Sequence, residues 1–203
     1  MKNSLYTFLL IVSSLSLATA QTEKGRWTVG ADVGNLSYSS QYGYRSFSGS
    51  LSPSAGYFAV NNLVAGAGLP VSFGTGSSNS RDYRYQTTVV GLSPFVRYYF
   101  GAASLKPYVG VSYAYSRTSQ RTNSPNPNQQ STYKGFSSNV SPNVGLAYFI
   151  NRTVSLNAGL SYVKSWYNNG APDYNNGGIR VESITTKSDY LSLNVGFQLF
   201  FGK

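Results

Sequence analysis

The sequence contains no cysteine and no histidine, and only 11% of its 203 residues are charged. Without cysteine, the chain can form neither a disulfide nor a thioether-linked lipid anchor. The absence of both residue types also excludes Ser–His and Cys–His nucleophilic catalysis and the usual zinc sites. The six acidic residues are scattered, and no two suggest a pair of catalytic carboxylates. We therefore predict that the protein is not an enzyme and that it holds no metal and no cofactor.

Beyond its N-terminus, the sequence lacks any apolar run of the roughly 20 residues that a membrane-spanning helix needs. At the N-terminus, Lys2 precedes an apolar stretch and the small residues Ala18-Thr19-Ala20. This order is typical of a secretory signal peptide that is cleaved before Gln21. A membrane-anchor helix is the alternative, but the apolar stretch is too short for one. We predict a signal peptide over residues 1–20 and a single domain over residues 21–203.

Glycine and aromatic residues are abundant, with 21 Gly, 18 Tyr and 11 Phe, and a short phrase rich in them recurs four times. Each copy alternates large apolar residues with small or polar ones, which is the pattern of a β-strand. The first three copies lead through a short turn into another alternating segment, and the fourth lies almost at the C-terminus. This arrangement predicts a sheet built from consecutive hairpins. The four copies are Leu51–Phe58, Leu92–Phe100, Val140–Phe149 and Leu191–Phe200.

The sequence predicts eight strands whose connections alternate in length. The repeated copies form four of them, and the other four begin at Trp27, Leu63, Pro107 and Val154. Short turns at one end and long loops at the other are typical of a transmembrane barrel, with the short turns in the periplasm. We therefore predict an all-β fold, an eight-stranded antiparallel transmembrane up-and-down β-barrel. The short connections lie near residues 61–62, 101–106 and 151–152, and the long ones cover residues 37–47, 74–85, 117–133 and 164–187.

The two faces of the predicted strands differ in composition. One face carries apolar side chains without a charge, such as Val109, Val111 and Tyr113, and the other carries mainly glycine, serine and asparagine. If the protein were a soluble barrel with the small polar face inside, its core could not offset the entropy of folding. We therefore assign the apolar face to lipid and the polar face to the lumen.

Three prolines, Pro53, Pro94 and Pro142, fall on the lipid face in the middle of predicted strands. A closed barrel has no edge strand, so a missing N–H group either costs a hydrogen bond of the ladder or lies at a bulge. We expect a local bulge or bend at all three positions.

These features together resemble the small outer-membrane β-barrels of the OmpX type and of the OmpA transmembrane type, a porin-family β-barrel domain. The resemblance covers nearly all of residues 26–201 and implies a bacterial outer-membrane location, reached after cleavage of the signal peptide. Such barrels usually end in an aromatic residue that the insertion machinery recognises. Phe201 fits this position, but Gly202 and Lys203 follow it. Because one barrel fold hosts many functions, the resemblance does not specify an activity.

Two charged residues are predicted to face the lumen, where small residues otherwise prevail. Arg97 stands where the other three copies have glycine, and Asp32 stands where neighbouring strands have Gly68 and Ser112. Their charges are opposite in sign, and their strands lie nearly opposite each other in the predicted ring. We expect an ion pair that closes the lumen. The alternative is that water solvates each charge separately.

Aromatic residues are also predicted on the lumen face, mostly near the periplasmic ends of the strands. An eight-stranded barrel is only wide enough for side chains to fill its interior or for one small ligand to bind. We expect these side chains to pack together as a floor that plugs the barrel. They are Phe95, Tyr99, Tyr108, Phe149 and Phe200.

The predicted long loops carry most of the positive charge of a chain whose formal net charge is +10. Basic residues together with tyrosines suit contacts with phosphates and sugars, including those of the anionic surface lipid. Alternation in residues 83–85 and 181–186 further predicts strands that protrude from the membrane. Ordinary solvated loops are the alternative to a binding surface. The candidate binding residues are Arg45, Arg81, Arg84, Arg117, Arg121, Lys134, Arg180 and Lys187.

The sequence therefore predicts a structural or surface-interaction role, in membrane integrity, surface-lipid contact or adhesion. The alternative is a narrow porin-like channel for ions or small solutes. The expected partners are outer-membrane lipid, including anionic surface lipid, the barrel-insertion machinery and a surface partner. We expect a monomer. We do not expect binding to nucleic acid, because the predicted secretion signal directs the chain away from it.

Overall fold

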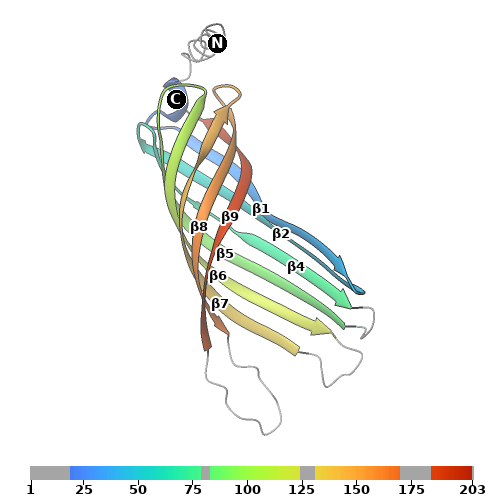
Figure 1. The fold of residues 1–203 in the computed structure, drawn as a ribbon. Coiled ribbons are helices and arrows are strands. Elements are labelled where there is room, and N and C mark those ends of the chain that lie inside the picture. The colour runs from blue at the N-terminus through green and yellow to red at the C-terminus, as the bar shows by residue number, and fades with distance from the viewer. Residues whose placement is uncertain (1–18, 79–82, 124–130, 170–183, 203) are drawn as a thin grey trace, which may run out of the picture.

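The computed structural model describes residues 19–78, 83–123, 131–169 and 184–202, and nearly all of its regular structure is β-strand (Figure 1). In this part of the chain, no helix is long and apolar enough to cross a membrane. A short 3-10 helix, η1 (Thr19–Thr22), precedes the strands. The strands are β1 (Trp27–Gln41), β2 (Tyr44–Val60), β3 (Leu63–Gly68), β4 (Val71–Ser78), β5 (Tyr83–Tyr99), β6 (Leu105–Asn123), β7 (Ser131–Phe149), β8 (Val154–Asn169) and β9 (Ile184–Phe201).

The strands close into one antiparallel ring, because β1 pairs with β9 as well as with β2. Strands β3 and β4 lie end to end between β2 and β5 and make a single crossing of the wall. They are separated by Leu69 and Pro70. Proline interrupts a ladder because it has no N–H group to donate. The nine strands of the described residues thus make eight crossings, which confirms the predicted eight-stranded antiparallel barrel.

The expected bulges at the three strand prolines are wrong. On one side, each proline keeps its place in the ladder, and the pairs are Ala31↔Pro53, Ala67↔Pro94 and Val111↔Pro142. On the other side, the ladder is interrupted at the proline and resumes in the same register. Because closure holds every strand between two neighbours, a missing donor interrupts the pairing locally without shifting it. The register shift of β1 against β2 lies elsewhere, between Gly34 and Ser37, where Asn35 has a φ of 52°.

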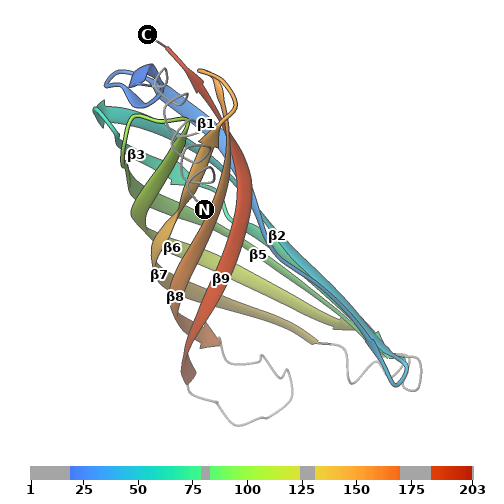
Figure 2. The same cartoon turned by 45° about the horizontal axis from the view of Figure 1, so that its top comes forward.

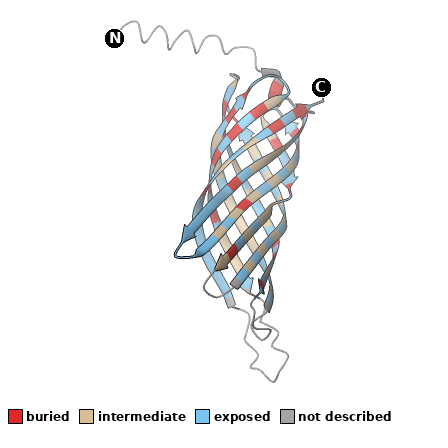
Figure 3. Cartoon of the chain, turned by 90° about the vertical axis from the view of Figure 1, so that its right-hand side faces the viewer, coloured by how far each residue is buried: buried red, intermediate tan, exposed pale blue. Residues whose placement is uncertain are grey.

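Exposure alternates along the strands between the outside of the barrel and its lumen (Figure 3). Val109, Val111 and Tyr113 are exposed on the outside, whereas Tyr108 is buried in the lumen. The exposed apolar side chains of the other strands occupy the same outward face. This arrangement confirms that the apolar face is the one turned toward lipid.

The strands are longer than a membrane requires, since a spanning strand needs about 9–11 residues and β6 and β7 have 19 each. They continue into segments that the sequence analysis assigned to loops, because pairing with neighbouring strands still satisfies the backbone there. The loop assignment is therefore wrong for six of the eight candidate binding residues, while Arg81 and Arg180 lie outside the described residues. The protruding strand at 83–85 is confirmed, and that at 181–186 is described only from Ile184. The six residues in strands are Arg45, Arg84, Arg117, Arg121, Lys134 and Lys187.

The ring is not closed over its full height. Strands β1 and β9 are paired only as far as Gly34↔Asn194. Beyond that pair, among the described residues, β1 pairs with β2 alone and β9 with β8 alone. The two strands diverge there in both views, so that β1 and β2 lie on one side of an opening and β8 and β9 on the other (Figures 1 and 2). We call this opening the β1–β9 seam. Where the seam begins, Ser192 Oγ on β9 donates a hydrogen bond to Asn35 Oδ1 on β1, at 3.3 Å.

Candidate functional site

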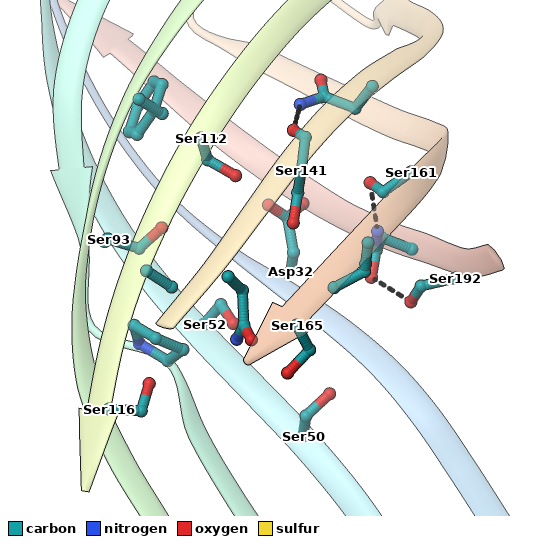
Figure 4. A pocket seen from close by; sticks show the side chains of 18 of the residues that line it. Asp32, Ser50, Ser52, Ser93, Ser112, Ser116, Ser141, Ser161, Ser165 and Ser192 are labelled. Atoms are coloured by element: carbon teal, nitrogen blue, oxygen red, sulfur yellow. Dashed lines mark hydrogen bonds between the residues drawn. The ribbon is translucent and has the colours of Figure 1, made fainter. Parts of the chain in front are cut away.

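A polar cavity of about 610 Å³ occupies the lumen. It is lined mainly by serine, asparagine and glycine residues that come from every strand of the barrel. Figure 4 shows part of this lining, in which Asn194 Nδ2 donates to Ser161 Oγ at 3.2 Å and Ser192 Oγ donates to Asn194 Oδ1 at 3.4 Å. The cavity reaches outward as far as Tyr167 and Thr186, so its polar wall continues into the protruding part of the strands. The lumen therefore has the predicted polar character.

Aromatic side chains fill the lumen at the end that carries the short turns. Phe58, Tyr99, Phe149 and Phe200 are between 0% and 3% exposed. The ring centroids of Phe149 and Phe200 lie 5.0 Å apart, and the Tyr99 hydroxyl donates to Gln198 Oε1 at 2.9 Å. The structure thus brings the five predicted floor residues together. The aromatic floor consists of Phe58, Tyr99, Tyr108, Phe149 and Phe200, with Val64 and Ala147 buried among them and Phe95 packed against them.

The segment before β1 packs against the same end of the barrel. Lys106 Nζ donates to Thr22 Oγ1 at 2.9 Å, and the Asn62 N–H donates to the Thr22 carbonyl at 2.7 Å. Lys106 and Arg26 are both buried. Burial lowers the pKa of the Arg26 guanidinium, and the negative charge of Glu23 partly offsets this effect. Residues 21–26 therefore add a polar layer to the aromatic floor.

Arg97 lies between the aromatic floor and the polar cavity. Its guanidinium carbon is 4.2 Å from the centre of the Tyr108 ring and 6.0 Å from that of Phe95. Its Nη1 donates to the Tyr99 hydroxyl at 3.4 Å. A guanidinium over an aromatic face gains about 0.5–2 kcal/mol, with the larger value where water is excluded. These contacts hold the guanidinium on the side of the lumen that β5 and β6 form.

Asp32 lines the same cavity as Arg97, but the structure does not bring the two side chains into the predicted contact. Within the described residues, no salt bridge joins them, because Tyr108 and Tyr99 hold the guanidinium on the β5–β6 side. The prediction of an ion pair is therefore wrong, because the two side chains occupy separate positions in the lumen. The opposite charges still attract each other across the cavity.

Glycines on the lumen face make room for large side chains from neighbouring strands. A β-carbon at Gly145 or Gly159 would overlap Tyr108, and one at Gly196 would overlap the Asp32 carboxylate. The glycines of the third and fourth copies are therefore needed for packing. The second copy has Arg97 at the corresponding position. Its side chain lies over the Tyr108 ring instead of leaving room for a neighbour.

Sequence reasoning missed Phe58, Lys106 and residues 21–26 as parts of the closed end. Phe58 was detectable, because aligning the first two copies places it at the same position as Tyr99. Lys106 was assigned to a short turn, and no pattern in the sequence indicates that its ammonium group meets Thr22. Such contacts depend on the closure of the ring, which brings the first described residues next to β6.

The sequence was also compared with family models. The model of the outer membrane protein beta-barrel domain matches residues 7–198. The chain belongs to this family. Membership in the outer membrane β-barrel family places the protein in the bacterial outer membrane, as predicted from the sequence. No curated protein matches the chain.

Several solved outer membrane proteins share the barrel. OprG from Pseudomonas aeruginosa is 14% identical, with 91% of this chain and 99% of that chain covered and a TM-score of 0.55. A major outer membrane protein from Thermus thermophilus is 17% identical, with coverages of 88% and 100% and a TM-score of 0.53. Outer Membrane Protein W from E. coli is 16% identical, with coverages of 88% and 99% and a TM-score of 0.50. At these identities, the similarity shows the fold alone.

Proposed function

We propose that this barrel is a non-enzymatic outer-membrane protein without an open pore, which acts through its outer surface in membrane integrity and surface contact. The aromatic floor carries the proposal. Phe58, Tyr99, Phe149 and Phe200 are almost completely buried where an ion would have to pass. Moving an unpaired charge through such an apolar layer is strongly unfavourable. Residues 21–26 pack against the same end and add to the barrier.

The outer surface supports the second half of the proposal. Pairing across the strands places seven exposed basic side chains on the outward face, above the lipid-facing residues. Among the described residues of this region, one is acidic, Asp189. Its carboxylate accepts a hydrogen bond from the Tyr162 hydroxyl at 2.9 Å. Excess positive charge at this height suits contact with anionic lipid or an anionic partner. We call this set the outer basic belt: Arg45, Arg84, Arg117, Arg121, Lys134, Lys164 and Lys187.

Complementation of cells that lack the gene tests the proposal. We expect the wild-type protein to restore resistance to a detergent that a damaged outer membrane admits. The lumen variant Asp32→Asn with Arg97→Gln should restore it equally well. The belt variant Lys134→Gln, Lys164→Gln and Lys187→Gln should not, since it loses three positive charges at the surface. Heat-modifiable migration on gels checks that both variants fold. Failure of the lumen variant together with success of the belt variant would contradict the proposal.

A second candidate function is a pathway for small polar solutes. The observations that favour it are the polar cavity and the β1–β9 seam, which gives the lumen a lateral opening above Gly34↔Asn194. Uptake of a radiolabelled small solute by proteoliposomes tests this pathway. Uptake above that of protein-free liposomes would support it over the closed barrel.

A further inference from the structure

Two arginines that are distant in sequence meet on the outward face of the protruding wall. Arg45 on β2 pairs with Ser77 on β4, and Ser77 pairs with Arg84 on β5. Side chains that are paired across antiparallel strands point to the same face of the sheet. This face is the outward one, because Leu51 on β2 lies on the same face as Arg45 and is exposed to lipid. The structure thus places two exposed guanidinium groups on either side of one small side chain.

A groove of about 470 Å³ lies at this place. The strands that carry Arg45 and Arg84 are roughly 10 Å apart, since neighbouring strands are spaced by about 4.8 Å. Arginine side chains on both sides of that gap can reach a single anion between them. Tyr38 and Phe47, which are paired across β1 and β2, also line the groove. None of the described residues that line it is acidic.

The groove lies at the height of the lipid headgroups. Going outward along β2 and β4, the apolar pair Leu51↔Val71 comes first. The rings of Phe47 and Phe73 follow, with centroids 5.6 Å apart. Arg45 comes next, one outward-facing position beyond Phe47. An apolar band, then an aromatic girdle, then basic residues is the order found where a barrel leaves the hydrocarbon core.

We propose that this groove binds the phosphate group of an anionic lipid headgroup in the outer leaflet. Guanidinium groups bind phosphate through paired N–H donors, and the Ser77 hydroxyl between them is a further donor. Tyr38 and Phe47 offer an aromatic surface to the rest of the headgroup and the start of its chains. A lipid is the occupant because the groove opens on the face that contacts the bilayer. The proposal rests on the surface role proposed above, but its test changes Arg45 and Arg84 rather than the three belt lysines, so each test can fail separately.

Native mass spectrometry of the full-length mature protein tests the proposal. The barrel is reconstituted in phosphatidylcholine nanodiscs that contain diphosphoryl lipid A as a minor component, and the lipid A retained after release is measured. We expect the double variant Arg45→Gln and Arg84→Gln to retain at least about tenfold less lipid A than the wild type, because two charge-assisted contacts are lost. The variant Ser77→Asp, which places a carboxylate in the groove, should lose lipid A to a similar extent.

The control variant Lys24→Gln with Arg152→Gln removes two exposed positive charges at the opposite end of the barrel. It should retain lipid A as the wild type does. Equal retention by the wild type, the arginine variant and the Ser77→Asp variant would overturn the proposal. Equal loss in the control variant would also overturn it, since the effect would then reflect net charge alone. Displacement of lipid A by inorganic phosphate would assign the groove to a free anion and overturn the lipid assignment.

Discussion

At the scale of single residues, the lumen is packed by large side chains that lie over glycines of the neighbouring strands. Tyr108 on β6 occupies the space beside Gly145 on β7 and Gly159 on β8. The same ring supports the guanidinium of Arg97 at 4.2 Å. A β-carbon at either glycine therefore changes the position of Tyr108 and, through it, the position of Arg97.

We predict that Gly145→Ala destabilises the barrel by about 1–3 kcal/mol, because the added methyl group overpacks the site. It would overlap both the Tyr108 ring and the carbonyl oxygen of Ala158. Urea unfolding of the protein in lipid vesicles measures the change in free energy of unfolding. Gly74→Ala is the matched control, since its β-carbon would meet nothing nearer than Ser48 Cβ at 3.8 Å. Equal stability of the two variants would show that Tyr108 is not tightly packed.

Comparison of the four copies was sufficient to single out Arg97 and to place it in the lumen, because position and face follow from strand alternation. The group that the Arg97 guanidinium contacts could not be predicted in the same way. The sequence shows two opposite charges in the lumen, but it does not show that Tyr108 comes from the adjacent strand to the position that the guanidinium can reach. Local aromatic contacts prevail here over a longer-range attraction across a polar space.

At the scale of elements, strand existence, order and direction were predictable, whereas strand length and closure were not. Alternation weakens outside the membrane because both faces meet water, so the outer parts of β6 and β7 resemble loops in the sequence. The β1–β9 seam could not be predicted, because it depends on how the first and last strands meet after the ring has formed. The register shift near Asn35 coincides with the point where their pairing ends.

The seam predicts an alternating pattern of amide hydrogen exchange in β9. Between Ile184 and Leu193, the amides that face β8 are paired and should exchange slowly. The amides between them face the seam and should exchange fast. The matched control is β6 from Arg117 to Thr122, which is paired with β5 and β7 on both sides and should be protected throughout. Exchange measured by NMR in micelles gives both patterns in one experiment. Uniform protection of β9 would contradict the open seam.

At the scale of the whole molecule, the barrel is filled at one end and hollow at the other. The aromatic floor and residues 21–26 occupy the end with the short turns, and the polar cavity occupies the rest of the lumen. The sequence indicated the floor because its aromatics share the lumen face near the strand ends. It did not indicate the polar layer, which forms when Thr22 meets Asn62 and Lys106, residues that are far away along the chain.

Single-channel recording in planar bilayers tests the central claim, that the lumen is closed, most directly. We predict no steady open channels for the wild-type protein, because ions cannot cross the aromatic floor without losing their water. The variant Phe149→Ala with Phe200→Ala removes two touching rings from that floor and should raise the frequency of openings. Steady wild-type channels of uniform conductance, unchanged in that variant, would contradict the closed barrel.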